Sequence, residues 1–184
     1  MNFTKLSISG LWVIEPKVFA DSRGYFMESW KKDEFEQTVG KVNFIQDNES
    51  KSSFGVFRGL HYQEGATAQA KLVHVIVGRV WDIAVDIRDG SPTFGQYEAM
   101  ELSEDNHLQF FIPCGFAHGF LVLSDTAVFS YKVDNIYSPS TEHTINCFDP
   151  DIAIQFPVDR AVMKLSPKDE KGLSLRDIQR GKTI

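Results

Sequence analysis

Short apolar runs, rich in β-branched and aromatic residues, fill the chain from about Phe54 to Val133 and are broken by Gly, Pro, Asp and Asn. This pattern is typical of strands joined by tight turns in a sandwich or barrel, so the chain is predicted to be all-β. A length of 184 residues is common for one such unit, and no internal repeat or linker-like run interrupts the sequence. Residues 1–184 are therefore predicted to form a single domain.

Two pairs of these runs are predicted to form hairpins. In the first pair, Lys71 to Val77 and Arg79 to Ile87 flank Gly78. In the second, the runs FLVLS and AVFSYKV meet at Ser124 and Asp125.

Two further segments have the features of short helices. Residues 25–39, YFMESWKKDEFEQTV, mix polar and aromatic residues and are followed by Gly40, which suits a helix C-cap. Near the C-terminus, Ser166 can cap a helical turn that starts with Pro167 and has Asp169 three residues after the cap. The predicted fold is thus a β-barrel or sandwich with a few short peripheral helices.

The bulk composition excludes several classes of partner. The formal net charge is -6, which argues against nucleic-acid binding because phosphate backbones are held by clustered Lys and Arg. No apolar run approaches the roughly 20 residues of a membrane helix, and the N-terminus has no features of a signal peptide. Cys114 and Cys147 are too few for a disulfide framework and lack zinc-site spacing. A cytoplasmic protein is expected.

The run FRGLHYQ, Phe57 to Gln63, places a cation and a titratable base in an apolar, strand-like segment of a chain with five histidines. Strict alternation puts Arg58 on one face of the strand and His61 on the other, so the two cannot line one cavity in a regular strand. A bulge at Gly59, or a site shared between two subunits, would bring them together.

A second histidine lies in PCGFAHGFLVLS, where alternation puts His118 on the face of Phe120 and Val122, the predicted interior. The spacing Pro-x-Gly-x-x-His resembles the second motif of cupin barrels, in which this histidine often binds a metal. A metal-binding cupin usually has a second histidine two residues after the first, where this chain has Gln63. Glutamine is a poor ligand for a transition metal, so the barrel is predicted to be metal-free. A metal-dependent oxygenase or isomerase that uses His61 and His118 is the rival hypothesis.

Without a metal, His61 is available as a general base, which requires a partner that orients the imidazole. Three carboxylates could serve, and the residues alone do not choose among Asp82, Asp86 and Asp169. The last of these is also explained by its capping position alone.

Two more polar side chains lie on apolar strand faces. Lys71 shares a face with Val73 and Val75, where a lysine is costly unless it is paired or faces a developing negative charge, although at a strand end it could extend to water. Tyr131 shares a face with Phe129. A tyrosine in such a place is more often a core aromatic, although its hydroxyl must find a partner or act as a proton donor.

Taken together, the motifs resemble the dTDP-4-dehydrorhamnose 3,5-epimerase family. The resemblance extends over nearly the whole chain, because the following segments occur in family order: EPKVFADSRGYFMES, FIQDNESKS, FRGLHYQ, AKLVHVIVGRVWDIAVDIRDGSPTFGQ, IPCGFAHGFLVLSD, YKVDNIYSPSTE and LSPKD. It implies a cupin-type jelly-roll homodimer that needs no metal or cofactor. The implied reaction inverts C3 and C5 of dTDP-4-dehydro-6-deoxy-α-D-glucose, with use of the product in rhamnose synthesis for surface polysaccharide.

The resemblance also implies roles for individual residues. His61 resembles the base, Asp169 its orienting partner, Lys71 the cation beside the carbonyl oxygen and Tyr131 the acid on the opposite face. His118 would contact the sugar and Arg58 the diphosphate. Further nucleotide-sugar contacts are implied for Gln46, Asp47, Asn48, Tyr137, Glu142 and Lys168.

An N-terminal arm is implied to reach the site of the partner subunit. It would carry Arg23, Phe26 and Glu28, with Phe26 near the thymine. Two alternatives remain open at this point: an epimerase of the same family that acts at C3 only, and a non-catalytic protein that binds nucleotide sugars.

Overall fold

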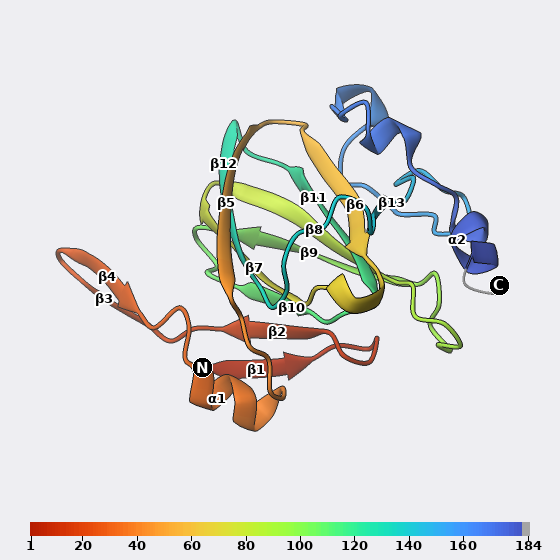
Figure 1. Cartoon of the computed structure of the whole chain (residues 1–184). Helices are drawn as coiled ribbons and strands as arrows, with labels where there is room; N and C mark the ends of the chain where they lie inside the picture. Colours follow the sequence, from red (N-terminus) through yellow and green to blue (C-terminus); the bar gives the residue numbers. More distant parts are fainter. Residues whose placement is uncertain (182–184) are drawn as a thin grey trace.

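The apolar runs of the sequence form antiparallel strands that assemble into two sheets packed face to face (Figure 1). The computed structural model describes residues 1–181 of the chain. One sheet has six strands in the order β1 (Asn2–Lys5), β2 (Trp12–Glu15), β10 (Gln109–Ile112), β7 (Lys71–Val77), β12 (Thr126–Val133) and β5 (Gln46–Ser53). The other has five, in the order β13 (Glu142–Thr144), β6 (Phe57–Gln63), β11 (Phe116–Val122), β8 (Arg79–Asp86) and β9 (Tyr97–Ser103).

A separate two-stranded arm, β3 (Val18–Asp21) and β4 (Gly24–Met27), projects from the body of the protein (Figure 1). The helices are short and peripheral: α1 (Lys32–Thr38), α2 (Leu175–Gly181) and single 3₁₀ turns at Gly65–Thr67, Arg160–Val162 and Asp169–Lys171. The prediction of an all-β fold with a few peripheral helices is confirmed. Within residues 1–181 no helix has the length and apolar character required to cross a membrane.

The alternation of side chains along each strand divides the apolar residues among three cores. In β11, Phe116, Phe120 and Val122 point between the two sheets, as predicted from their shared face. Ala117 and Leu121 point the other way, into a second core on the outer face of the five-stranded sheet, which the C-terminal segment and α2 cover. A third core lies where α1 packs Phe35, fully buried, against the outer face of the six-stranded sheet.

The two predicted hairpins are wrong, because the paired runs belong to different sheets. Strands β7 and β8 are joined by Gly78 alone, and one residue is too short for the common hairpin loops. At Gly78 the chain passes from one sheet to the other, and it does so again between β11 and β12. The two crossings are in close contact, because a Cβ on Gly78 would lie 2.1 Å from the carbonyl oxygen of Thr126. Such crossings between facing sheets are characteristic of a jelly roll.

The helix predictions are confirmed in part. Helix α1 ends as expected, with the N–H of Gly40 donating to the carbonyl of Phe35 at 3.4 Å and Gly40 at a φ of 131°. It begins only at Lys32, because the residues around Phe26 form strand β4. Near the C-terminus, Oγ of Ser166 accepts from the N–H of Asp169 at 3.2 Å, as expected of a capping serine. The turn itself is 3₁₀ and covers Asp169–Lys171, so it begins two residues later than the predicted start at Pro167.

A one-residue bulge in β6 resolves the conflict between Arg58 and His61. Opposite β11, His61 pairs with His118 and Arg58 with Phe120, so β6 uses three steps where β11 uses two. The extra residue turns Arg58 and His61 to the same inner face, which confirms the predicted bulge at Gly59. At a φ of 141°, Gly59 lies so close to β11 that a Cβ would be 2.5 Å from the Cα of Gly119.

We therefore predict that Gly59→Ala lowers the free energy of unfolding by about 2–4 kcal/mol, because the new methyl group meets backbone atoms that have no room to move. Gly90→Ala is the matched control, since Gly90 also has positive φ, 67°, but nothing lies within 4 Å of its Cβ position. The control is expected to cost about 1 kcal/mol. Urea denaturation measures both, and equal losses would contradict the close packing at the bulge.

Candidate active site

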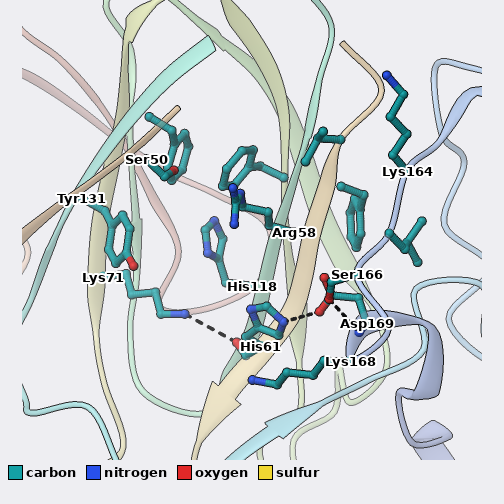
Figure 2. Close-up of a pocket in the computed structure, with 15 residues that line it drawn as sticks. Ser50, Arg58, His61, Lys71, His118, Tyr131, Lys164, Ser166, Lys168 and Asp169 are labelled. Carbon is teal, nitrogen blue, oxygen red and sulfur yellow. Dashed lines mark hydrogen bonds and ion pairs between the residues drawn. The ribbon is translucent and has the colours of Figure 1, made fainter. Parts of the chain in front are cut away.

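A cavity of about 460 Å³ opens between the two sheets and is lined by charged and aromatic side chains (Figure 2). Strand β6 and strand β11 contribute residues from one side, and β7 and β12 from the other. The cavity brings together the following predicted residues: Arg58, His61, Lys71, His118, Tyr131, Lys168 and Asp169. Its volume lies in the range of small-molecule sites.

His61 is paired with a carboxylate at the cavity wall. Its Nε2 lies 2.5 Å from Oδ1 of Asp169, which resolves the choice among the three candidate carboxylates (Figure 2). Burial would raise the pKa of Asp169, but hydrogen bonds from His61 and Ser166 outweigh it and lower that pKa, so the carboxylate is ionised near neutrality. An ionised partner fixes the proton on Nε2 and leaves Nδ1 of His61 free to accept a proton.

Lys71 extends into the cavity beside His61, with Nζ 3.5 Å from the carbonyl oxygen of His61. Burial lowers the pKa of Lys71 to about 8, and the negative charges of Asp82 and Glu142 oppose that shift. The amine of Lys71 lines the cavity and, in its charged form, can stabilise a negative charge that develops on a ligand there.

The other two candidate carboxylates have partners of their own. Asp82 is fully buried, and both of its oxygens lie 3.0 Å from Nε2 of His118. Burial lowers the pKa of His118 more than Asp82 raises it, which favours a neutral imidazole. Asp86 instead accepts hydrogen bonds from Arg88, Ser91 and Thr93, so its role is to hold a turn.

Tyr131 faces the cavity from β12, on the sheet opposite to His61 (Figure 2). Burial raises the pKa of Tyr131, and the nearby positive charge of Arg58 only partly opposes this. The phenol thus keeps its proton at neutral pH and can serve as a donor. Together, a base with a free nitrogen and a protonated phenol line two sides of one cavity.

Arg58 is held by a hydrogen bond that crosses between the sheets, from its Nε to Oγ of Ser52 at 3.0 Å. Its Nη groups have no hydrogen-bond acceptor within residues 1–181, so they can bind an anion.

A second, smaller hollow of about 120 Å³ adjoins the cavity and shares His61, Lys71 and Tyr131 with it. Tyr137 and Glu142 line it, and the hydroxyl of Tyr137 donates to Oε2 of Glu142 at 2.8 Å. Lys168 forms an ion pair with the same carboxylate.

Strand β5 presents only part of its predicted set to the cavity. Ser50 lines the cavity, and alternation puts Gln46 and Asn48 on the same face of β5, nearer the edge of the cavity. Nε2 of Gln46 donates to Oδ1 of Asn48 at 2.7 Å. Asp47 lies on the opposite face and pairs with Lys132.

The arm residues lie apart from the cavity of their own chain. Arg23 pairs with Asp21, Glu28 pairs with Lys31, and the ring of Phe26 is 65% exposed. None of the three arm residues named in the sequence analysis lines the cavity.

Sequence reasoning missed several cavity residues. Ser50, Ser52, Lys164 and Ser166 lie at or beside the cavity. Alternation along β5, which pairs with the strand of Tyr131, could have indicated Ser50 and Ser52. Within the described residues, no group of three His, Cys, Asp or Glu side chains gathers so as to hold a metal ion.

Comparisons with known proteins agree on one family. Residues 5–177 match the family described as dTDP-4-dehydrorhamnose 3,5-epimerase. A protein of that name from Shigella flexneri is 52% identical over 178 residues, which cover 96% of this chain and 97% of the relative.

Solved structures agree with the sequence match. The epimerase of Legionella pneumophila, in complex with dTDP-4-keto-L-rhamnose, has a TM-score of 0.91 and 48% identity, covering 95% of this chain and 93% of its own. A 3′-monoepimerase from Streptomyces bikiniensis with dTDP-quinovose has a TM-score of 0.90 at 34% identity, covering 98% and 91%. These similarities identify the fold as the cupin type that the sequence motifs indicated.

We predict that Lys71 titrates near pH 8, whereas an ordinary lysine titrates near 10.5. A lowered pKa means that the ammonium group loses its proton at lower pH. Reductive ¹³C-methylation of the lysines followed by NMR titration measures this, with the Lys71 signal assigned by its absence in Lys71→Arg. Asp82→Asn removes a negative charge and should lower the pKa of Lys71 further. A Lys71 signal that titrates with the surface lysines would contradict the lowered pKa.

Proposed function

The chain belongs to the dTDP-4-dehydrorhamnose 3,5-epimerase family, and we propose that its reaction is carried out by four side chains of the main cavity: His61, Asp169, Lys71 and Tyr131. The substrate is dTDP-4-dehydro-6-deoxy-α-D-glucose, and the product is dTDP-4-dehydro-β-L-rhamnose. The single observation that carries the proposal is the placement of a carboxylate-oriented imidazole and a protonated phenol on facing sheets around one cavity.

The chemistry follows from the C4 ketone of the substrate, which acidifies the hydrogens on C3 and C5. Nδ1 of His61 takes the proton from carbon, and the positive charge that forms on the imidazole is stabilised by Asp169. The electron pair of the broken C–H bond moves to the C4 oxygen, where Lys71 stabilises the enolate. The electron pair then returns from the C4 oxygen to the carbon as Tyr131 delivers its proton to the opposite face, which inverts that centre. Proton exchange with solvent returns His61 to its neutral form and Tyr131 to its protonated form before the second carbon reacts.

Binding of the nucleotide is assigned to residues at the cavity edge. Arg58, with its Nη groups free of protein acceptors in residues 1–181, suits the diphosphate. His118, at the buried end of the cavity, is a further proposed contact of the nucleotide sugar. The contacts proposed nearer its edge are Gln46, Asn48, Tyr137, Glu142 and Lys168. Asp47 is left out, because it lies on the opposite face of β5 and pairs with Lys132. No metal or cofactor takes part in the proposed steps.

We further propose that the protein works as a homodimer in the cytoplasm. The arm is a two-stranded ribbon, which has little stability alone, and it exposes Phe19 by 51%, Tyr25 by 57% and Phe26 by 65%. Docking of this arm on a second copy would cover these rings and carry Arg23 and Glu28 to the partner's cavity. The two cysteines are free thiols, which suits a reducing compartment.

The test of the reaction is proton NMR in deuterium oxide with the ketosugar. Wild-type protein should exchange the hydrogens on both C3 and C5, and His61→Asn should lose about 100- to 10,000-fold in rate while it still binds dTDP. Tyr131→Phe is the matched variant, since it should retain exchange by the base but lose inversion. Exchange at C3 alone would support a C3 epimerase, and saturable binding without any exchange would leave a non-catalytic binding protein.

The dimer proposal is tested by complementation between two variants, His61→Asn and Arg23→Ala/Phe26→Ala, each expected to be poorly active alone. In mixed dimers the intact arm of the first variant completes the cavity of the second, so random mixing should restore about a quarter of wild-type activity. If the mixture is no more active than its separate components, the arm does not serve the partner's site.

A further inference from the structure

Gln63 is a buried glutamine, 7% exposed, at the end of β6 and on the same face as the proposed base His61. It occupies the position at which a metal-binding cupin has a second histidine. A buried amide is costly unless its hydrogen-bonding groups are satisfied, so its partners indicate what it does.

The side-chain amide of Gln63 makes three hydrogen bonds. Nε2 donates to the carbonyl of Thr67 at 2.7 Å and to the carbonyl of Ile136 at 3.0 Å. Oε1 accepts from the N–H of Ser138 at 2.7 Å. Both amide hydrogens are therefore used, and all three bonds go to backbone groups in two loops.

Two of these bonds lie on either side of Tyr137. The carbonyl of Ile136 and the N–H of Ser138 are the backbone groups that flank this residue, so one side chain fixes the chain before and after it. Tyr137 itself is 57% exposed, and its hydroxyl donates a hydrogen bond to Glu142. The position of the ring therefore depends on the backbone that Gln63 holds.

A separate set of bonds anchors the base of this loop. The Nδ2 group of Asn135 donates to the carbonyl of Ala66 at 2.8 Å, and Nε2 of Gln69 donates to the carbonyl of Asn135 at 2.6 Å. These bonds would keep the loop attached without Gln63, so loss of Gln63 should loosen Tyr137 and leave the fold intact.

We propose that Gln63 is a positioning residue that holds Tyr137 in the hollow adjoining the cavity and thereby sets the affinity for the nucleotide. This inference rests on the proposed function, in which Tyr137 is a substrate contact. Gln63 would then affect ligand binding indirectly, through Tyr137, from a position on β6 two residues after the proposed base His61.

The experiment is a double-mutant cycle on dTDP affinity, measured by calorimetry with the full-length protein. The variants are Gln63→Met, which keeps the length of the side chain without its hydrogen bonds, Tyr137→Ala, and the two combined. Gln63→Met is expected to weaken dTDP binding by about tenfold, and by no more than Tyr137→Ala does. In the Tyr137→Ala background, Gln63→Met should have no further effect.

The controls separate positioning from general damage. Gln155→Met removes a glutamine that bonds the backbone of Ala153 away from the cavity, and it should leave affinity unchanged. Gln63→Glu is the second variant if Gln63→Met does not fold, because it keeps the acceptor for Ser138 and loses the two donated bonds. It should likewise weaken binding through Tyr137 alone.

Additive losses in the double variant, or unchanged affinity in Gln63→Met, would overturn the inference. Unchanged affinity in Tyr137→Ala would also overturn it, because Tyr137 would then not contact the nucleotide. The proposed reaction fails on a different result, namely retention of C3 and C5 exchange by His61→Asn.

Discussion

One extra residue in β6 determines whether the cavity can contain both a base and an anion-binding cation. In a regular strand Arg58 and His61 would point to opposite faces, and one of them would be buried in the core behind the sheet. The bulge turns both inward, and it fits because Gly59 and Gly119 leave no side chain between β6 and β11. The same bulge leaves Leu60 and Tyr62 on the outer face, where they pack in the second core.

Two histidine–aspartate pairs lie at the cavity, and their positions in it differ. The His61–Asp169 pair lies at the wall, where Nδ1 of His61 can accept a proton from a ligand. The His118–Asp82 pair lies at the buried end of the cavity, and its aspartate is within electrostatic reach of Lys71. The first pair is placed to exchange protons with a ligand. In the second pair, the carboxylate of Asp82 raises the pKa of Lys71 and so partly offsets the lowering by burial.

Sequence reasoning located the strands, because alternation reports which face a side chain occupies, and together with the family resemblance it named most of the polar residues that line the cavity. It correctly placed His118 with Phe120 in the interior and required a bulge at Gly59. It failed on the hairpins, since strand patterns and turn residues show where a chain reverses but not which sheet it enters. It also left three carboxylates open, because contact between His61 and Asp169 spans 108 positions and depends on how the C-terminal segment packs.

The geometry also bears on how one base can serve two carbons. C3 and C5 flank the C4 ketone, and their hydrogens lie on the same face of the ring. A base placed below C4 on that face is therefore near both hydrogens. In the proposed mechanism Lys71 holds that oxygen throughout. Once His61 has passed the first proton to solvent, the second deprotonation therefore needs only a small shift of the ring and no second base. The demanding step is then return of the proton from the opposite face, where a phenol fixed on β12 must reach each carbon in turn. The difference between one and two inversions therefore depends on how far the sugar can move past Tyr131. The residues that hold the nucleotide limit this movement, so they also influence how many carbons are inverted.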